Sequence, residues 1–158
     1  MPAGTVVTNV KDAIAVVLSI FESAKHEIVF LTPHSLASLG GTYNAMQIAK
    51  QFIQNGGTVR SIIFISRDNI EAAQIRQDIG ENLRHSDQFH EIFMIVGDKQ
   101  LSISSINLGV PEYTLDTPII AFWSDSPPYA EYLLTSFENA WSEAVPAEVR
   151  IKELSEQG

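Results

Sequence analysis

The sequence contains no cysteine, few basic residues and no apolar run long enough to cross a bilayer. Without cysteine the chain has no thiolate nucleophile, no disulfide and no cysteine-ligated zinc or iron-sulfur site. The apolar run at residues 13–21 is too short for a membrane span and contains Ser19. No basic segment followed by an apolar stretch starts the sequence. We therefore expect a cytoplasmic protein that has no membrane partner.

Positive charge is also scarce. Nineteen Asp and Glu residues stand against ten Lys and Arg, which gives a formal net charge of -9. Binding to a phosphate backbone usually requires a cluster of basic side chains that displaces counterions. We therefore expect no direct contact with nucleic acid, and the acidity otherwise indicates only good solubility.

The length of 158 residues suits one domain that can bury its own core. We expect residues 1–146 to form a single domain. Residues 147–158 then form a charged C-terminal tail, for which an exposed strand, a short helix and a disordered segment all remain open.

Apolar residues that recur at three- and four-residue intervals after Asn9 predict an amphipathic helix with Asn9 as its N-cap. A third helix is expected to carry Ile75, Ile79 and Leu83 on one face. The predicted order is helix, strand, helix, strand, helix, hairpin, strand, helix. This order indicates an α/β fold with a mixed, mostly parallel sheet that is flanked by helices. Strands are expected at residues 26–32, 58–66, 89–96, 101–106 and 117–124.

Residues 90–107 carry the most informative pattern in the chain. The stretch resembles the signature of the phospholipase D-like superfamily, His-x-Lys-x4-Asp on one strand, then a turn and a strand ending near Gly-Ser-x-Asn. His90 stands at the histidine position, and Ser104-Ser105-Ile106-Asn107 is similar to the downstream segment. Ile92 stands at the lysine position and Gly97 at the aspartate position, with Asp98 one residue later. Residues 27–32, 55–63 and 129–144 resemble the family's first core strand, its second strand and its closing helix.

The resemblance implies a phospholipase D-like half from which the catalytic groups have been lost. In the family the histidine attacks phosphorus, the lysine holds the phosphate oxygens and a carboxylate orients the imidazole. Loss of the lysine removes a charge that commonly contributes several kcal/mol to such a site. The chain is similar in this respect to effector-binding domains of archaeal sugar-sensing transcriptional regulators. A non-catalytic ligand-sensing or protein-interaction domain that forms a homodimer is the implied function.

Two other functions stay open. One is a phosphodiesterase or nuclease-like hydrolase that uses His90 from two subunits, which requires Arg60, Arg67 and Lys99 to converge on the site. Lys99 itself is expected in the hairpin turn, where it points elsewhere. The other is a protein-binding adaptor that recognises its partner through a sheet edge or an aromatic patch.

Ligand-binding candidates follow from position in the predicted sheet. His34 and Ser35 follow the first strand, and α/β sheets place ligands beyond the carboxyl ends of their strands. Ser102 and Ser104 share one face of a strand that leads to Asn107. These hydroxyls either line a cavity or face solvent, and the solvent-facing arrangement is the simpler interpretation.

We expect neither a metal nor a cofactor. The four histidines show no short spacing that is typical of zinc ligands, and Gly40-Gly41 lacks the spacing of a nucleotide-binding loop. His26 and His85 each follow a basic residue, which indicates two surface histidines.

Overall fold

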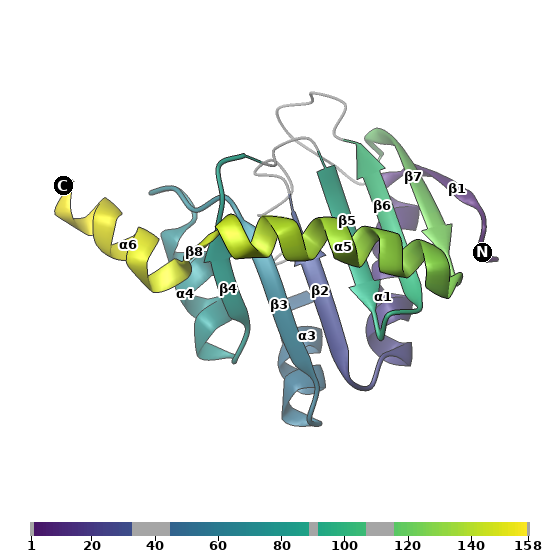
Figure 1. The fold of residues 1–158 in the computed structure, drawn as a ribbon, viewed down its shortest axis with the longest axis horizontal. Coiled ribbons are helices and arrows are strands. Elements are labelled where there is room, and N and C mark those ends of the chain that lie inside the picture. Colours follow the sequence, from purple (N-terminus) through teal and green to yellow (C-terminus); the bar gives the residue numbers. More distant parts are fainter. Residues whose placement is uncertain (1, 33–44, 89–91, 107–115, 158) are drawn as a thin grey trace.

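The protein, seen here as a computed structural model, is described over residues 2–32, 45–88, 92–106 and 116–157. Eight strands form one sheet in the order β1-β7-β6-β5-β2-β3-β4-β8 (Figure 1). The strands are β1 (Val6–Asn9), β2 (Glu27–Leu31), β3 (Thr58–Ile63), β4 (Asn82–His85), β5 (Ile92–Gly97), β6 (Leu101–Ile106), β7 (Pro118–Ser124) and β8 (Val145–Pro146). The helices are α1 (Val10–Ser23), α3 (Ala45–Gln54), α4 (Ile70–Asp78), α5 (Pro127–Glu143) and α6 (Ala147–Glu156).

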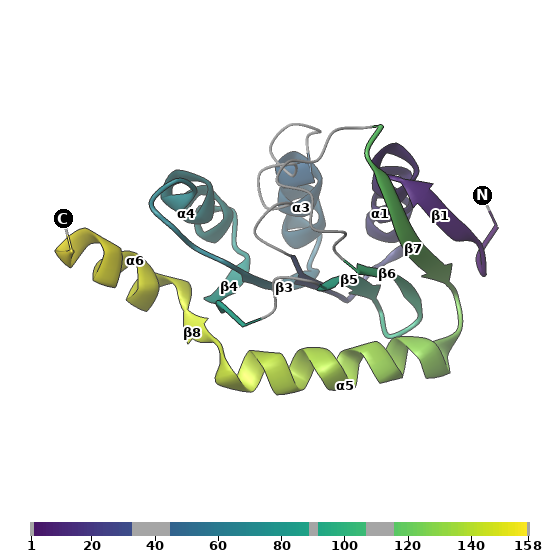
Figure 2. The same cartoon turned by 90° about the horizontal axis from the view of Figure 1, so that it is seen from above.

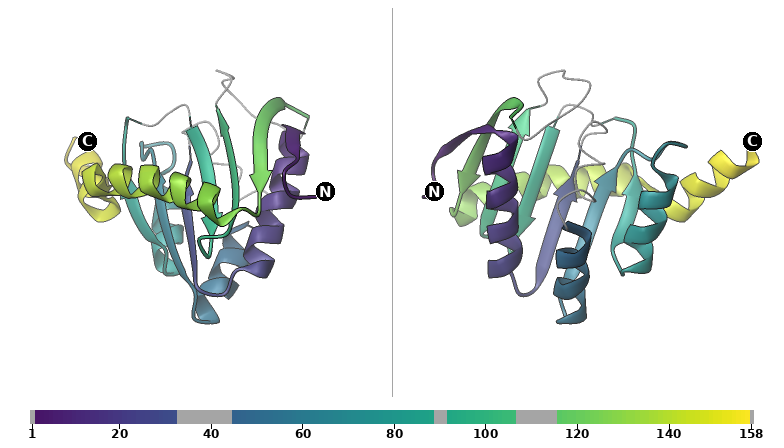
Figure 3. Two further views of the ribbon diagram at one scale, coloured as in Figure 1. Left: turned by 45° about the vertical axis from the view of Figure 1, so that its right-hand side comes forward. Right: turned by 180° about the vertical axis from the view of Figure 1, so that it is seen from behind.

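Helices cover both faces of this sheet. Figure 2 shows α1, α3 and α4 on one face and α5 running across the other. The view from behind in Figure 3 brings the first three helices to the front. A central strand in such a sheet must be apolar on both sides. In β2, Ile28 packs in the core under α1 and α3, whereas Val29 and Leu31 pack in the core under α5.

The first helix forms where the apolar periodicity predicts it. The Oδ1 of Asn9 accepts a hydrogen bond from the backbone N–H of Asp12 at 2.8 Å, which satisfies one unpaired donor of the first turn. Val10, Val16 and Ile20 are buried along one side of α1. This confirms Asn9 as the N-cap of an amphipathic helix.

The sheet is mixed, as predicted, but its parallel part is smaller than expected. Within the described residues, parallel pairing joins only β2 to β3 and β3 to β4. The other neighbours pair antiparallel, because β5, β6 and β7 form a meander and the short strands β1 and β8 add to the two edges. Neither short edge strand follows from the sequence pattern.

The third helix is shorter than predicted. It ends at Asp78, and Gly80 then adopts the left-handed conformation with a φ of 107°. Leu83 therefore lies in β4, beside Ser61 of β3, and not on the helix face with Ile75 and Ile79. A spacing of four residues at 75, 79 and 83 fits a helix, but the glycine stops it before the last position.

The C-terminal segment is a helix, one of the three forms that the sequence left open. Helix α6 reaches away from the centre of the sheet (Figure 1), but its residues Ala147 and Leu154 are buried against Ile63 and Leu83. The Nε of Arg150 also donates to the carbonyl oxygen of Ile65 at 3.1 Å. The expected domain boundary at residue 146 stays a prediction. No helix in the described part of the chain has the length and apolar character needed to span a bilayer.

Candidate functional site

The candidate site lies at one end of the sheet. Strands β2, β5 and β6 are neighbours, and Leu31, Ile92 and Ile106 lie at the same end of the three strands, since Leu31 pairs with Met94 and Ile92 pairs with Ile106. From these ends the chain continues into the predicted site residues. Those residues, His34, Ser35, His90 and Asn107, lie outside the described residues.

Strand β5 carries the part of the family motif that the structure describes. The aspartate position is Gly97, which is buried and packs directly on α1. A Cβ atom at this residue would lie 2.6 Å from Cγ2 of Ile20 and 3.5 Å from Cβ of Ala24. Because Ile20 is fully buried, it has little freedom to move aside. The close packing of helix and strand therefore leaves no space for an aspartate side chain.

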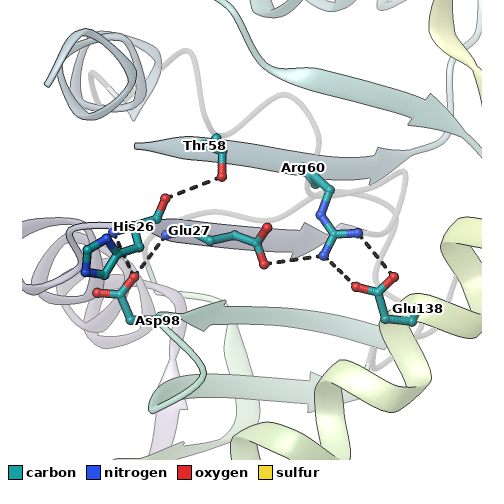
Figure 4. Close-up of polar contacts among 6 residues, drawn as sticks. All are labelled: His26, Glu27, Thr58, Arg60, Asp98 and Glu138. Carbon is teal, nitrogen blue, oxygen red and sulfur yellow. Dashed lines mark hydrogen bonds and ion pairs between the residues drawn. The ribbon is translucent and has the colours of Figure 1, made fainter. Parts of the chain in front are cut away.

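Asp98, one residue later, has a structural role at the start of β2. Its carboxylate accepts hydrogen bonds from the backbone N–H groups of Lys25, His26 and Glu27 at 2.8, 2.9 and 2.9 Å. Figure 4 shows the bonds from His26 and Glu27. Burial of the carboxylate by itself raises its pKa, but these three donors and the charge of His26 outweigh it, so the pKa lies below the ordinary value of 3.8. Asp98 thus fixes the start of β2, at the end of the sheet opposite to the candidate site.

Lys99 lies in the same turn. Asp98 and Lys99 have positive φ angles of 52° and 58°, and the turn sits beside the beginning of β2, where the N–H of Asp98 donates to the carbonyl of Glu27 at 2.8 Å. The expectation that Lys99 lies in the hairpin turn is confirmed, and this turn is at the end of the strands opposite to the candidate site.

The two serines of β6 lie under α5. The Oγ of Ser104 is 2.9 Å from the hydroxyl of Tyr129, the third residue of the helix. Ser102 is fully buried, and its Oγ has no hydrogen-bond partner within the described part of the chain. The solvent-facing interpretation is therefore wrong, because α5 covers this face of the sheet. Whether either serine binds a ligand stays a prediction.

Arg60 is the centre of an ion-pair cluster between the sheet and α5 (Figure 4). Its guanidinium donates to both carboxylate oxygens of Glu138, at 3.2 and 2.5 Å, and to Glu27 at 3.3 Å. The group also lies 5.1 Å from the ring centre of Phe137 and 5.5 Å from that of Trp141. The hydrogen bond to Glu138 raises the pKa of Arg60, and the same bond lowers the pKa of Glu138.

The other arginines also have partners within the protein. Arg76 forms a two-pronged ion pair with the buried Glu81, at 2.8 and 3.0 Å, and contacts Ser61. Arg84 donates to the carbonyl of Trp141 at 2.7 Å, and Arg67 to that of Leu154 at 3.4 Å. Arg150 binds the carbonyl of Ile65. Arg60 and Lys99 both lower the pKa of Glu138, whereas Arg67 bonds to the carbonyl of Leu154, so the three cations that the hydrolase alternative requires do not converge within the described residues.

His85 is buried, with 8% of its surface exposed, and its Nδ1 accepts a hydrogen bond from the N–H of Ile65 at 2.9 Å. The prediction of a surface histidine is therefore wrong. The prediction rested on the basic neighbour Arg84. Adjacent residues of a strand point to opposite faces, so the exposure of Arg84 does not indicate that of His85. Leu83 and His85 share one face of the strand because they are two residues apart, and the apolar Leu83 is the signal that could have indicated that this face is buried.

No family model matches the chain, and no curated protein sequence matches it. Several solved structures, in contrast, match the chain over most of its length. TrmBL2, described as an archaeal chromatin protein with a novel mode of DNA binding, superposes with a TM-score of 0.69 and 16% identity over 90% of this chain and 53% of its own. Nuc from Salmonella typhimurium, a phospholipase D family member, has a TM-score of 0.66 and 19% identity over 90% of this chain and 97% of its own. NucT from Helicobacter pylori has a TM-score of 0.65 and 10% identity, with the same coverage.

These likenesses define the class of protein. The chain is an α/β protein with the phospholipase D-like fold, which confirms the resemblance that residues 90–107 indicated. At 10 to 19% identity the likeness concerns the fold alone. The chain spans about half the length of TrmBL2 and nearly the whole length of Nuc and NucT.

The expectation that nucleic acid is not a direct partner is contradicted by the first of these comparisons. TrmBL2 has this fold over 90% of the present chain and is described as a DNA-binding protein. The expectation rested on the net charge of the whole chain. The net charge of the whole chain does not determine the local charge of one surface region. The net charge of -9 therefore does not exclude contact with DNA.

Proposed function

We propose that this chain is a non-catalytic regulatory domain with the phospholipase D-like fold, and that it responds to a bound ligand as a homodimer. The observation that carries the proposal is the use of residues 97 and 98. Gly97 packs on Ile20 and carries no carboxylate, and Asp98 holds the start of β2 at the end of β5 opposite to residue 90. A histidine at position 90 then has no lysine at position 92 and no carboxylate from this turn.

The distribution of positive charge supports the same proposal. Phosphoryl transfer needs cationic groups placed where negative charge develops. All five arginines of this chain donate to carboxylates or backbone carbonyls within the protein. Lys25 and Lys99 lie at the end of the sheet opposite to the motif.

The ligand site that we propose is the end of the sheet at which β2 and β6 finish. It would use His34, Ser35 and Asn107, with Ser104 supporting it from β6. Ser102 pairs with Val96 near the other end of β6 and lies farther from this site. The likeness to TrmBL2 is compatible with a regulatory role, and it makes duplex DNA one of the ligands to be tested. A regulatory domain of this kind needs differential binding between two states, and a homodimer provides a common way to couple them.

The first experiment tests catalysis. Purified protein is incubated with bis-p-nitrophenyl phosphate, and release of nitrophenolate is followed for the unaltered chain and for His90→Ala. We expect no turnover above that of the His90→Ala variant. Turnover that disappears in His90→Ala would establish the hydrolase alternative and end the proposal of a non-catalytic domain.

The second experiment tests ligand sensing by thermal unfolding in the presence of sugars, sugar phosphates, nucleotides and duplex DNA. A ligand at a hundredfold excess over its Kd stabilises the native state by roughly 2.7 kcal/mol, which gives a clear rise in Tm. We expect the rise to vanish in His34→Ala and to persist in His26→Ala, a histidine at the opposite end of β2. An equal loss in both variants would place the ligand elsewhere, and sedimentation velocity reports whether the chain is a dimer.

A further inference from the structure

Large apolar side chains are exposed together at one edge of the sheet, which we call the β1–β7 patch. It consists of Val6, Ile120, Phe122 and Tyr132, with 56, 65, 37 and 68% of their surfaces exposed. Only two other large apolar residues in the described part of the chain are comparably exposed, Ile75 and Val149. An apolar cluster of this kind on a folded surface commonly marks an interaction site.

The register of the strands holds the patch together. Val6 of β1 lies directly opposite Phe122 of β7, and Ile120 is on the same face because it is two residues away. The ring of Phe122 meets Tyr129 edge to face at 5.3 Å, and Tyr129 stacks on Tyr132 at 6.3 Å. The patch therefore continues from the edge of the sheet onto the first turns of α5, on the right-hand side of Figure 1.

The patch borders an open strand edge. Strand β1 is the last in the sheet, and no described segment pairs with its outer side (Figure 3). An unpaired edge offers backbone donors and acceptors to an additional strand. Side chains of an added strand that point to the α5 face would pack on Val6, so backbone pairing and apolar contact are available at one place.

Charge determines which partner fits. Residues 100–149, which include β7 and α5, contain seven acidic residues and no Lys, Arg or His. Exposed Asp116 and Asp125 bracket the two ends of β7, and exposed Glu131 precedes Tyr132 on α5. An apolar surface with an acidic border complements a segment that has cations at its ends. A second copy of the chain would instead bring two such acidic borders together, which costs free energy through like-charge repulsion.

We propose that the β1–β7 patch binds a protein partner through an extended segment with an apolar centre and Lys or Arg at both ends. The segment adds to the outer edge of β1 and covers Val6 and Phe122. Its cations meet the carboxylates of Asp116 and Asp125. This surface is separate from the proposed ligand site, and the proposal does not depend on the absence of catalysis.

The experiment measures binding of a dye-labelled peptide, Lys-Lys-Val-Thr-Ile-Thr-Val-Thr-Lys-Lys with blocked ends, to the full chain by fluorescence anisotropy. A matched peptide has Glu in place of each Lys. We expect the basic peptide to bind, its affinity to fall with added salt, and the acidic peptide to bind at least about tenfold more weakly. No saturable binding of the basic peptide at protein concentrations up to about 1 mM, where an interaction is worth roughly 4 kcal/mol, would overturn the proposal.

Variants locate the binding. Val6→Lys combined with Phe122→Lys changes the two exposed residues that the segment covers, and we expect at least about a tenfold increase in Kd, as for central interface residues. The matched control is Val149→Lys on α6, which is 44% exposed and outside the patch. An equal effect of patch and control variants would contradict the proposal. Should the patch variant fail to fold, Asp125→Asn with Asp116→Asn tests the same contact through charge alone.

Self-association is the remaining outcome. Sedimentation velocity of the unaltered chain and of the patch variant should give the same oligomeric state. A dimer that dissociates in the patch variant would show that a second copy occupies the surface, and it would overturn the proposal of a basic partner. A failure of ligand sensing in thermal unfolding leaves this result unaffected, so the two proposals are tested separately.

Discussion

Ile20 of α1 fills the space that a side chain at Gly97 of β5 would need. Its Cγ2 lies 2.6 Å from the position of a Cβ at residue 97, and Ile20 has no exposed surface. This contact brings the helix close to the strand that carries the family motif. A side chain at residue 97 and the isoleucine cannot occupy the same volume.

We expect Gly97→Asp to lower the free energy of unfolding by about 3 kcal/mol or more, because it overpacks the core and buries a carboxylate. Gly97→Ala should cost less, since it adds only one methyl group. Urea unfolding followed by circular dichroism gives both values.

A double-mutant cycle tests the cause of this loss. Ile20→Ala removes the Cγ2 atom, so Gly97→Ala should cost at least about 1 kcal/mol less in the Ile20→Ala protein than in the unaltered one. Equal costs in the two backgrounds would show that another contact, and not Ile20, restricts residue 97.

The lowered pKa of Asp98 predicts a contribution to stability that depends on pH. A carboxyl group whose pKa is lower in the folded state stabilises the fold above its unfolded pKa, here about 3.8, and this contribution disappears as the pH falls through the folded value. We expect stability to fall more steeply below about pH 4 in the unaltered chain than in Asp98→Asn. At pH 7 the variant should be less stable by about 1 kcal/mol, a small value because the group is partly exposed.

Urea unfolding of both proteins between pH 7 and pH 3 measures the difference. Other carboxylates, including Glu138 with its lowered pKa, titrate in both proteins and cancel in the comparison. Parallel curves over the whole range would mean that the three N–H groups at residues 25–27 do not favour the charged carboxylate.

Arg60 should hold α5 on the sheet mainly by packing and less by charge. Its side chain is 20% exposed, whereas that of Glu138 is 50% exposed, so water weakens the ion pair. We expect Arg60→Ala to cost about 2 kcal/mol, through lost contact with Phe137 and Trp141 as well as the lost pair. Arg60→Met keeps an apolar stem and should cost about 1 kcal/mol.

The control is Glu138→Gln, which removes the charge of the partner and leaves Arg60 on the two rings. Its cost should be about 0.5 kcal/mol and should decrease at high salt. A cost for Glu138→Gln as large as that for Arg60→Ala would show that the ion pair, and not the aromatic contact, dominates.

Local patterns predicted the parts of the fold that depend on neighbours in sequence. The strand expected at residues 26–32 is β2, and Asn9 indicated the start of α1. In α5, which corresponds to the closing helix that residues 129–144 resemble, Leu133, Phe137 and Trp141 are buried along one side at four-residue intervals. Each of these signals arises within one turn or one strand, so the sequence alone contains it.

Contacts between distant residues could not be predicted in this way. Arg60 and Glu138 are 78 residues apart, and nothing in either neighbourhood indicates the other. The same holds for the buried hydrogen bond between Ser61 and Glu81, because the sequence pattern placed residue 81 inside a helix that was expected to reach residue 83. The extent of antiparallel pairing depends on the short strands β1 and β8, whose lengths of four and two residues give almost no periodic signal.

Ser102 and Ser104 differ in hydrogen bonding, and this difference can be tested without knowledge of a ligand. The Oγ of Ser104 bonds to Tyr129, so Ser104→Ala should lower the free energy of unfolding by about 1 kcal/mol, with more if the phenol is left unpaired. The Oγ of Ser102 has no partner among the described residues, so Ser102→Ala should change stability by less than about 0.5 kcal/mol or increase it. Urea unfolding of both variants, prepared without added ligand, gives the comparison. A loss above about 1 kcal/mol for Ser102→Ala would mean that a bound water or a co-purified ligand already satisfies this hydroxyl.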